Sequence, residues 1–428
     1  MPSIRRPAVL VAVALALAAA LVVAPLALRA GPAAASTADE RSALVNRLAG
    51  DMSQAGNPSG AYVLDGRTGD QLFTWNADTL LTLASNTKLW TTGAVLSARG
   101  PHGTIQTRVL SRGKMKGPGI LHGNLFLRGA GDPTFGDQAW VDSTFGGGPS
   151  VEGLARKLWN AGLREVRGSV IGDESRFDSL RGGPTSGYAA SGYIGAPLTA
   201  LAFDHGIDDS GHFQSDPPQY AADRFAAALG AQRIRVDRGT RTGRTPNGAR
   251  VLARVRSLPM GRIVHYMDVP SDNWDAEELA KGLGGAGEQG TTARGAQLIM
   301  IYANGLGFHP ELSDGSGLSH SDVATPHELA RFLQAVRTRR EGRALHKALP
   351  VAGMDGTLAD RMTSGPAYGR CAAKTGTLTG VSALSGYCHT LGGHTLVFSI
   401  LMNGVPDPGS AHSLQDDMAQ AIADYRGQ

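Results

Sequence analysis

The sequence contains few cysteines, no block of like charges and no glycine repeat. Only two of its 428 residues are cysteine, which is too few for a disulfide-rich scaffold or a multi-cysteine zinc site. Its 58 glycines follow no Gly-x-y period, so a collagen-like chain is excluded. The cations behind the net charge of +4 are scattered, with no Lys/Arg tract and no interleaved aromatics. Nucleic acid is therefore not expected as a partner.

What remains is an ordinary globular composition. Apolar side chains make up 42% of the chain and charged side chains 18%, which excludes a disordered protein and a membrane protein with several spans. At roughly 150 residues per domain, this length predicts two or three domains, each large enough for its own core.

The one long hydrophobic run lies at the N-terminus. Arg5 and Arg6 precede an apolar stretch over residues 8–28, and small residues follow at 33–36. This order is typical of a secretory signal. The run is also nearly long enough to span a bilayer, so residues 1–35 are predicted to be a cleaved signal peptide, with a retained anchor as the alternative. In both cases the rest of the chain is exported to the cell envelope, and membrane contact is limited to an uncleaved N-terminal segment.

The two cysteines lie in neighbouring strand-like stretches. Cys371 lies in one of them and Cys388 in the next, residues 384–390. A hairpin that turns near residues 379–380 would place them roughly opposite each other, a spacing that allows a cross-strand bond. Because cysteines outside the cytosol are usually paired, we expect a disulfide; two buried thiols are the alternative.

The two ends of the chain predict similar elements. Hydrophobic spacing predicts helices over 42–52, 85–98 and 414–425, and strands over 60–64, 71–73 and 395–401. Strands from both ends suggest one sheet assembled from distant segments. The middle of the chain is richer in Gly, Pro and Arg, and it reads as short strands and loops. The predicted organisation is therefore a domain in two parts, 36–105 and 259–428, interrupted by an insertion over 106–258.

A Ser-x-x-Lys motif opens the predicted helix at residues 85–98. Residues three apart share a helix face, so the Lys88 amine can reach the Ser85 hydroxyl. Serine is a poor nucleophile until a neighbouring base takes its proton, and lysine can do so when burial or a second cation lowers its pKa. The same spacing between Ser111 and Lys114 falls in a glycine-containing loop, where we expect a solvated turn instead.

Two further short motifs follow along the chain. Ser271-Asp272-Asn273 precedes a predicted helix over 275–281, a place where such turns usually act as helix caps. Lys374-Thr375-Gly376-Thr377 lies on a predicted strand. A glycine there lets a ligand approach the strand edge, and a lysine with two hydroxyls suits a carboxylate.

Ser-x-x-Lys, Ser-x-Asn and Lys-Thr-Gly, in this order on helix, loop and strand, are the motif set of penicillin-recognising serine enzymes. With the segments 129–134, 196–201 and 314–319, the chain resembles the class C low-molecular-mass penicillin-binding proteins, the D-alanyl-D-alanine carboxypeptidase/endopeptidase family. The resemblance implies an α/β (α+β) fold. This is a penicillin-binding/serine β-lactamase-like transpeptidase domain, with an antiparallel five-stranded sheet flanked by helices, plus one or more inserted β-rich domains.

The resemblance also implies a function and a set of catalytic residues. Members hydrolyse the D-Ala-D-Ala bond of peptidoglycan stem peptides through an acyl-enzyme, and β-lactams inhibit them covalently; the balance between carboxypeptidase and cross-link endopeptidase activity stays open. Ser85 is the expected nucleophile and Lys88 the general base. Ser271 would relay a proton to the leaving amine, and Asn273 would orient the substrate amide and Lys88. Lys374 would keep Lys88 partly neutral by like-charge repulsion.

Substrate binding is expected around the third motif. By resemblance, Thr375 and Thr377 hold the terminal carboxylate next to Gly376, and the backbone N–H groups of Ser85 and Thr377 form the oxyanion hole. The segment containing Ser316 is also expected to contact the substrate. No cofactor or metal is expected, because the 12 histidines show no metal-ligand pattern.

His320 departs from the family pattern. In the family, the Ser-Gly-Leu-Ser segment is usually followed by an arginine thought to recognise the peptide side chain. Histidine is mostly neutral above its pKa of about 6.5, so a carboxylate on the substrate side chain would be held less firmly and the preferred stem peptide is open. A solvated loop position for His320 is an equal alternative.

Three rival functions were weighed against the peptidase. A β-lactamase of class A needs a glutamate downstream of the second motif, and residues 305–308 contain none. An α/β-hydrolase would show Gly-x-Ser-x-Gly, and this sequence has none. A wall-binding protein without turnover would have little reason to retain Ser85, Lys88 and Lys374.

Overall fold

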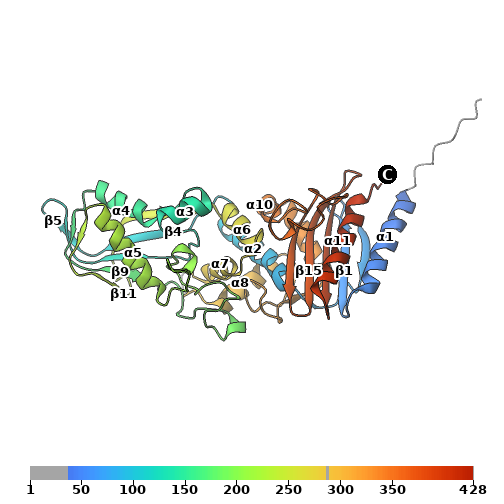
Figure 1. Cartoon of the computed structure of the whole chain (residues 1–428), viewed down its shortest axis with the longest axis horizontal. Helices are drawn as coiled ribbons and strands as arrows, with labels where there is room; N and C mark the ends of the chain where they lie inside the picture. Colours follow the sequence, from blue (N-terminus) through green and yellow to red (C-terminus); the bar gives the residue numbers. More distant parts are fainter. Residues whose placement is uncertain (1–36, 286–288, 428) are drawn as a thin grey trace, which may run out of the picture.

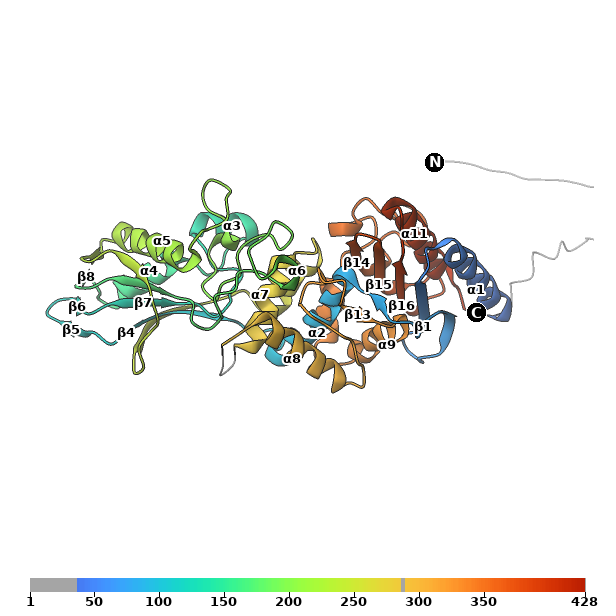
Figure 2. The same ribbon diagram turned by 90° about the horizontal axis from the view of Figure 1, so that it is seen from below.

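The computed structural model describes residues 37–285 and 289–427, so the predicted signal or anchor lies outside the described residues. Within these ranges, every helix is too short or too polar to cross a membrane. The molecule is elongated (Figure 1): a sheet with α1 (Thr37–Gln54) and α11 (Pro408–Asp424) occupies one end, and a second group of strands and helices occupies the other. A cluster of helices joins the two ends, and Figure 2 shows the same order from below.

The sheet at the C-terminal end is antiparallel throughout, with the order β14-β15-β16-β1-β2. Its strands are β1 (Ser59–Asp65), β2 (Gln71–Trp75), β14 (Cys371–Leu378), β15 (Val381–His389) and β16 (Thr395–Asn403). The pairing of β1 with β16 confirms the prediction of one sheet built from both ends of the chain. The predicted antiparallel five-stranded sheet is confirmed as well.

The strands of this sheet are apolar on both faces because helices cover both. In β1, Ala61 and Val63 belong to the core cluster that contains α1 and α11. Their neighbours Tyr62 and Leu64 belong to the cluster of α2 and α9 on the opposite face. Alternate residues of a strand point to opposite faces, so a nearly continuous apolar run is what this double burial requires.

The helices between the two ends surround the core cluster that also contains Tyr62 and Leu64 of β1. They are α2 (Thr87–Arg99), α6 (Met260–Asp268), α7 (Asn273–Gly284), α8 (Thr292–Asn304), α9 (Pro326–Arg337) and α10 (Gly342–Ala348). Trp90 of α2 is fully buried, and its ring lies 4.1 Å from that of Phe332 on α9. A short pair, β3 (Leu81–Thr82) with β13 (Val323–Ala324), joins the turn before α2 to the segment before α9.

The predicted insertion forms two separate sheets, ordered β10-β8-β6-β5 and β11-β9-β7-β4-β12. Their strands are β4 (Gln106–Ser111), β5 (Lys114–Lys116), β6 (Ile120–His122), β7 (Leu125–Arg128), β8 (Glu165–Val166), β9 (Val170–Asp173), β10 (Arg235–Val236), β11 (Thr240–Thr242) and β12 (Arg250–Arg256). No residue of β4–β12 joins the sheet at the C-terminal end. This separation supports the boundaries at 106 and 258, which remain our proposal.

The expectation that this region contains only short strands and loops is wrong. It also contains α3 (Gln138–Phe145), α4 (Val151–Asn160) and α5 (Pro217–Ala231). Helix α4 buries Val151, Leu154, Ala155 and Leu158, which have helical spacing. The Ser150 side chain caps it by accepting from the Gly153 N–H.

The cysteine prediction is confirmed. Cys371 and Cys388 face each other in the register of β14 and β15, and they form a disulfide with Cα atoms 4.0 Å apart. The bond joins the edge strand of the sheet to its neighbour, three residues before Lys374.

Candidate active site

Ser85 lies in a strained turn directly before α2. The turn, Ala84–Asn86, is a single 3-10 turn, and Ala84 has a φ of 47°, a left-handed conformation that is uncommon for a residue with a Cβ. Gly317 lies against this turn, where a Cβ would come within 1.9 Å of the Ala84 carbonyl oxygen. The turn leaves Ser85 half-buried, so its hydroxyl stays accessible.

Lys88 lies one helical turn further on and is completely buried. Its Nζ donates to Ser85 Oγ at 3.0 Å, to Asn273 Oδ1 at 2.6 Å and to the Ser316 carbonyl at 2.8 Å. A neutral amine has two hydrogens and one lone pair. It could therefore keep its bonds to Asn273 and Ser316 while its lone pair takes the Ser85 proton.

Asn273 is held from both ends of its side-chain amide. Its Oδ1 accepts from Lys88, and its Nδ2 donates at 2.8 Å to the carbonyl of Tyr193, a residue of the predicted insertion. Asn273 is the first residue of α7, whose N-cap is Asp272. Ser271 before it has a φ of 66° and is half-buried. Its hydroxyl makes no hydrogen bond with any residue of 37–285 or 289–427.

The third motif lies on β14, an edge strand of the sheet. Asn86 Nδ2 donates to the Lys374 carbonyl at 3.2 Å and so ties the Ser85 turn to this strand. A Cβ on Gly376 would lie only 3.0 Å from the Ser85 nitrogen, which explains why glycine stands there. Thr375 donates to Thr357 Oγ1 at 2.7 Å, whereas the neighbouring Thr377 is exposed, with Oγ1 3.5 Å from His412 Nε2.

Three buried charges determine the electrostatics of the site. Burial lowers the pKa of Lys88 to about 8, and this outweighs the opposing effect of four carboxylates: Asp268, Asp272, Asp314 and Glu277. Burial and repulsion by Lys88 lower the pKa of Lys374 to about 7, with Asp268 acting in the opposite direction. Burial raises the pKa of Asp268 to about 7, against the attraction of both lysines. Burial, rather than repulsion by Lys374, is thus the main cause of the Lys88 shift.

The loop from Asp314 to Asp322 contacts Lys88 through the Ser316 carbonyl. Asp314 accepts the N–H groups of Ser316, Gly317 and Ser319. Ser316 is buried, with its hydroxyl 3.4 Å from Asp314 and its carbonyl on Lys88. We therefore propose that Ser316 positions the base and does not contact substrate, contrary to our expectation.

His320 lies on the surface of the same loop. It is exposed, and its carbonyl accepts from Thr82 Oγ1 at 3.1 Å. The look-alike motif is structurally unrelated to the first one, since Ser111 ends β4 and Lys114 begins β5. Ser111 is buried and donates to the Asn124 carbonyl, so it is not the solvated residue that we expected.

Two contributors to the site could not be found from the sequence. Asp268 interacts electrostatically with both Lys88 and Lys374, and it accepts from Thr92 Oγ1 at 2.7 Å. Tyr193 provides the carbonyl that orients Asn273. Neither belongs to a motif. Asn86 was visible inside Ser85-Asn86-Thr87-Lys88, but only the fold shows that it binds the strand.

A serine hydroxyl 3.0 Å from a buried lysine amine is the arrangement that a serine enzyme with lysine as its base would need. A model of the D-Ala-D-Ala carboxypeptidase 3 (S13) family matches residues 42–209 and 210–425 of the chain. The chain belongs to this family and is a serine-type D-Ala-D-Ala carboxypeptidase. The predicted family is confirmed.

Curated relatives agree with this assignment over most of the chain. The D-alanyl-D-alanine carboxypeptidase of Actinomadura sp. is 29% identical over 90% of this chain and 84% of its own. Penicillin binding protein 4 from Haemophilus influenzae has a similar structure, with a TM-score of 0.74 and 20% identity over 89% of this chain and 99% of its own. A predatory peptidoglycan endopeptidase from Bdellovibrio bacteriovorus matches with a TM-score of 0.54 and 18% identity, over 86% and 92% of the two chains. The structural matches confirm the fold.

Proposed function

We propose that Ser85 cleaves the D-Ala-D-Ala bond of peptidoglycan stem peptides through an acyl-enzyme, and that penicillins acylate the same hydroxyl. The observation that carries this proposal is the position of the buried Lys88 amine, 3.0 Å from Ser85 Oγ and 2.6 Å from Asn273 Oδ1. A base buried beneath a half-exposed hydroxyl is suited to activate it without itself meeting the substrate. Membership of the carboxypeptidase family supports the substrate class.

The proposed reaction has two steps. Neutral Lys88 takes the Ser85 proton while Oγ attacks the carbonyl carbon of the penultimate D-Ala. The C–N bond then breaks, the leaving amine receives a proton through Ser271, and the terminal D-Ala departs. Water adds to the ester, returns a proton to the Ser85 oxygen and releases the shortened peptide. A penicillin follows the first step, but its amine stays attached to the acyl group and the adduct persists.

Lys374 and its neighbours on β14 complete the proposed site. Thr377, exposed beside His412, is suited to bind the terminal carboxylate together with Thr375. The Ser85 and Thr377 N–H groups would stabilise the oxyanion, and the loss of one such donor typically costs roughly 100-fold or more in rate. The exposed His320 is the residue proposed to contact the substrate side chain.

Export to the cell envelope belongs to the same proposal. Stem peptides occur there, and a disulfide such as Cys371–Cys388 persists in oxidising compartments. The same site is also proposed to cleave peptide cross-links, and this endopeptidase activity is measured alongside the release of terminal D-Ala.

The decisive experiment incubates the full chain with a fluorescent penicillin and records intact mass. We expect one stable adduct on Ser85 that is absent from Ser85→Ala. The matched control is Ser111→Ala, which removes the serine of the look-alike motif and should leave the adduct unchanged. Rapid hydrolysis of the drug would favour a β-lactamase, and no reaction would favour a non-catalytic wall-binding protein. Release of D-Ala and cleavage of cross-linked dimers are measured on the same samples.

A further inference from the structure

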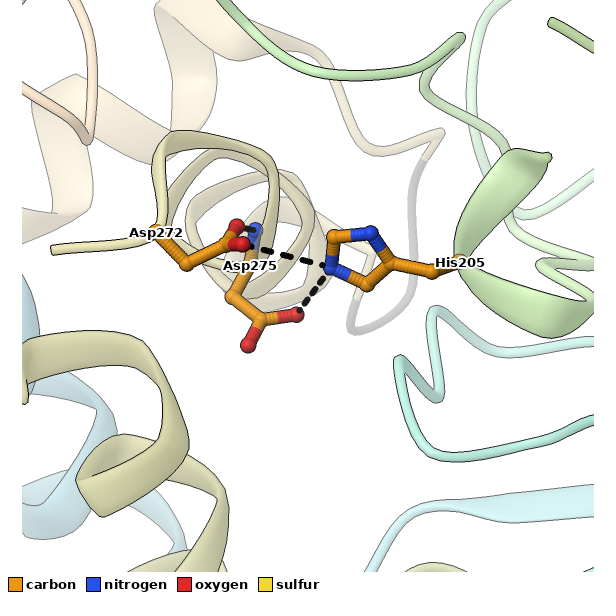
Figure 3. A group of neighbouring side chains, drawn as sticks. All are labelled: His205, Asp272 and Asp275. Carbon is orange, nitrogen blue, oxygen red and sulfur yellow. Dashed lines mark hydrogen bonds and ion pairs between the residues drawn. The ribbon is translucent and has the colours of Figure 1, made fainter. Parts of the chain in front are cut away.

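Three potential metal ligands meet where the predicted insertion contacts the start of α7 (Figure 3). His205 lies in a short 3-10 turn, Asp204–Gly206, whereas Asp272 and Asp275 lie at the N-terminus of α7, on either side of Asn273. The imidazole Nε2 lies 3.5 Å from Asp272 Oδ2 and 3.4 Å from Asp275 Oδ1. All three ligand atoms lie within 4.8 Å of one another.

The two Nε2–oxygen separations are longer than good hydrogen bonds and match the spacing of metal ligands. An N–H···O bond normally spans roughly 2.7–3.2 Å. Zinc binds imidazole nitrogen and carboxylate oxygen at roughly 2.0–2.2 Å in a tetrahedron, which places neighbouring ligand atoms about 3.3–3.6 Å apart. We propose that His205, Asp272 and Asp275 bind a zinc ion, with water as the fourth ligand.

Each ligand is already held in a suitable orientation. Asp272 uses Oδ1 to accept the Asp275 N–H at 2.8 Å, so its Oδ2 is left for the ion. The His205 ring lies 4.2 Å from the ring of Trp274, whose Nε1 donates to the Pro197 carbonyl. Supporting contacts of this kind orient the ligands in known metal sites.

The charge and the space around the cluster also suit a cation with bound water. The cluster borders a cavity of about 920 Å³ that is also lined by Asp137, Asp208 and Asp209, which leaves room for a water ligand.

The ion would join the predicted insertion to the helix that carries Asn273. Two neighbouring contacts already connect these regions: the Tyr193 carbonyl accepts from Asn273, and the Thr199 N–H donates to Glu278 Oε1 at 2.6 Å. The zinc takes no part in bond breaking. Its role would be to hold the first turn of α7 in place, and the inference does not rest on the proposed peptidase activity.

The test measures zinc binding directly on the full chain. After treatment with a chelator, we expect the wild type to bind one zinc per chain in calorimetry and elemental analysis, and cobalt in its place to give the intense visible absorption of a tetrahedral site. His205→Gln and Asp275→Asn should each weaken binding by roughly 100-fold or more. The matched control is His212→Gln, an exposed histidine beside Asp208 in the same region, which should bind zinc as the wild type does.

The outcomes separate this inference from the proposed function. No stoichiometric binding to the wild type, or binding unaffected by both substitutions, would overturn the zinc site and leave an imidazolium–carboxylate ion pair. Circular dichroism is recorded for every variant as a check of folding, and the penicillin adduct on Ser85 is measured separately. If the wild type binds zinc and forms no adduct, the proposed function fails and the zinc site stands.

Discussion

The candidate active site and the predicted insertion differ in how many charged side chains they bury. Around the candidate active site, Lys88, Lys374, Asp268, Glu277 and Glu278 are almost completely buried. In the predicted insertion the largest core cluster is apolar, built from residues such as Leu154, Val170 and Phe225, and fewer charged side chains, among them Asp132 and Asp173, are buried. Most ion pairs there, such as Arg167–Glu165, are partly exposed.

The buried charges around the candidate active site are expected to lower the stability of the folded protein in that region. Burying a charge is expensive unless it is paired, and the burial raises the pKa of Glu277 and of Glu278 to about 8. The surface pairs of the insertion contribute little to stability. The larger group of buried charges around Ser85 points to that region as the functional one.

Replacement of the buried base should give the largest effect. Lys88→Met keeps the volume and removes the amine, so acylation by penicillin should slow by roughly 10³-fold. Stopped-flow fluorescence measures the rate. Lys281→Met is the control, because Lys281 is also buried but pairs with Asp178 at 2.6 Å, away from Ser85. It should destabilise the fold and leave the acylation rate of the folded protein unchanged; a rate loss equal to that of Lys88→Met would contradict the comparison.

A cavity in the insertion should lower the stability of the protein without changing its acylation rate. Phe225→Ala removes a fully buried ring from the apolar cluster, and the free energy of unfolding should fall by about 3–5 kcal/mol. Penicillin acylation of the folded protein should stay at the wild-type rate. Urea unfolding followed by circular dichroism gives the stability. A large loss of acylation would mean that the two ends are more tightly linked than their cores indicate.

The loop beneath Lys88 provides a pair of carboxylates with opposite expected behaviour. Burial and the neighbouring Asp314 raise the pKa of Asp322 well above its usual range, so we expect the loss of its charge in Asp322→Asn to be tolerated. That change should cost less than about 1 kcal/mol, whereas Asp314→Asn disturbs three N–H bonds and should cost about 2–3 kcal/mol. Equal losses in urea unfolding would contradict the different behaviour expected of the two carboxylates.

The pH profile should show the smallest effect. Only neutral Lys88 can accept the Ser85 proton, so acylation should increase with pH and level off above the pKa of about 8. Asp268 raises that pKa, and Asp268→Asn should therefore move the midpoint to lower pH by roughly one unit. Asp424→Asn, an exposed carboxylate paired with Arg47, is the control that should leave the midpoint in place.

Local patterns were sufficient for the elements at both ends of the chain. The strands at 60–64 and 395–401 and the cysteine hairpin were predicted because alternate burial and turn residues act over a few positions. The helix at Val151–Asn160 was missed, although its Ser150 cap and helical spacing were readable. The right-handed helix spacing of Ser85 and Lys88 likewise predicted their contact at 3.0 Å.

What the sequence by itself determined is the motif set, and with it the family and the chemistry, because each motif is short enough for covalent spacing to fix its geometry. Tertiary structure alone decided that Asp268 would share a buried site with two lysines, that Tyr193 would hold Asn273, and that His205 would meet the first turn of α7. These groups come from segments far apart in the chain. Their meeting depends on how whole layers pack, which no local spacing can specify.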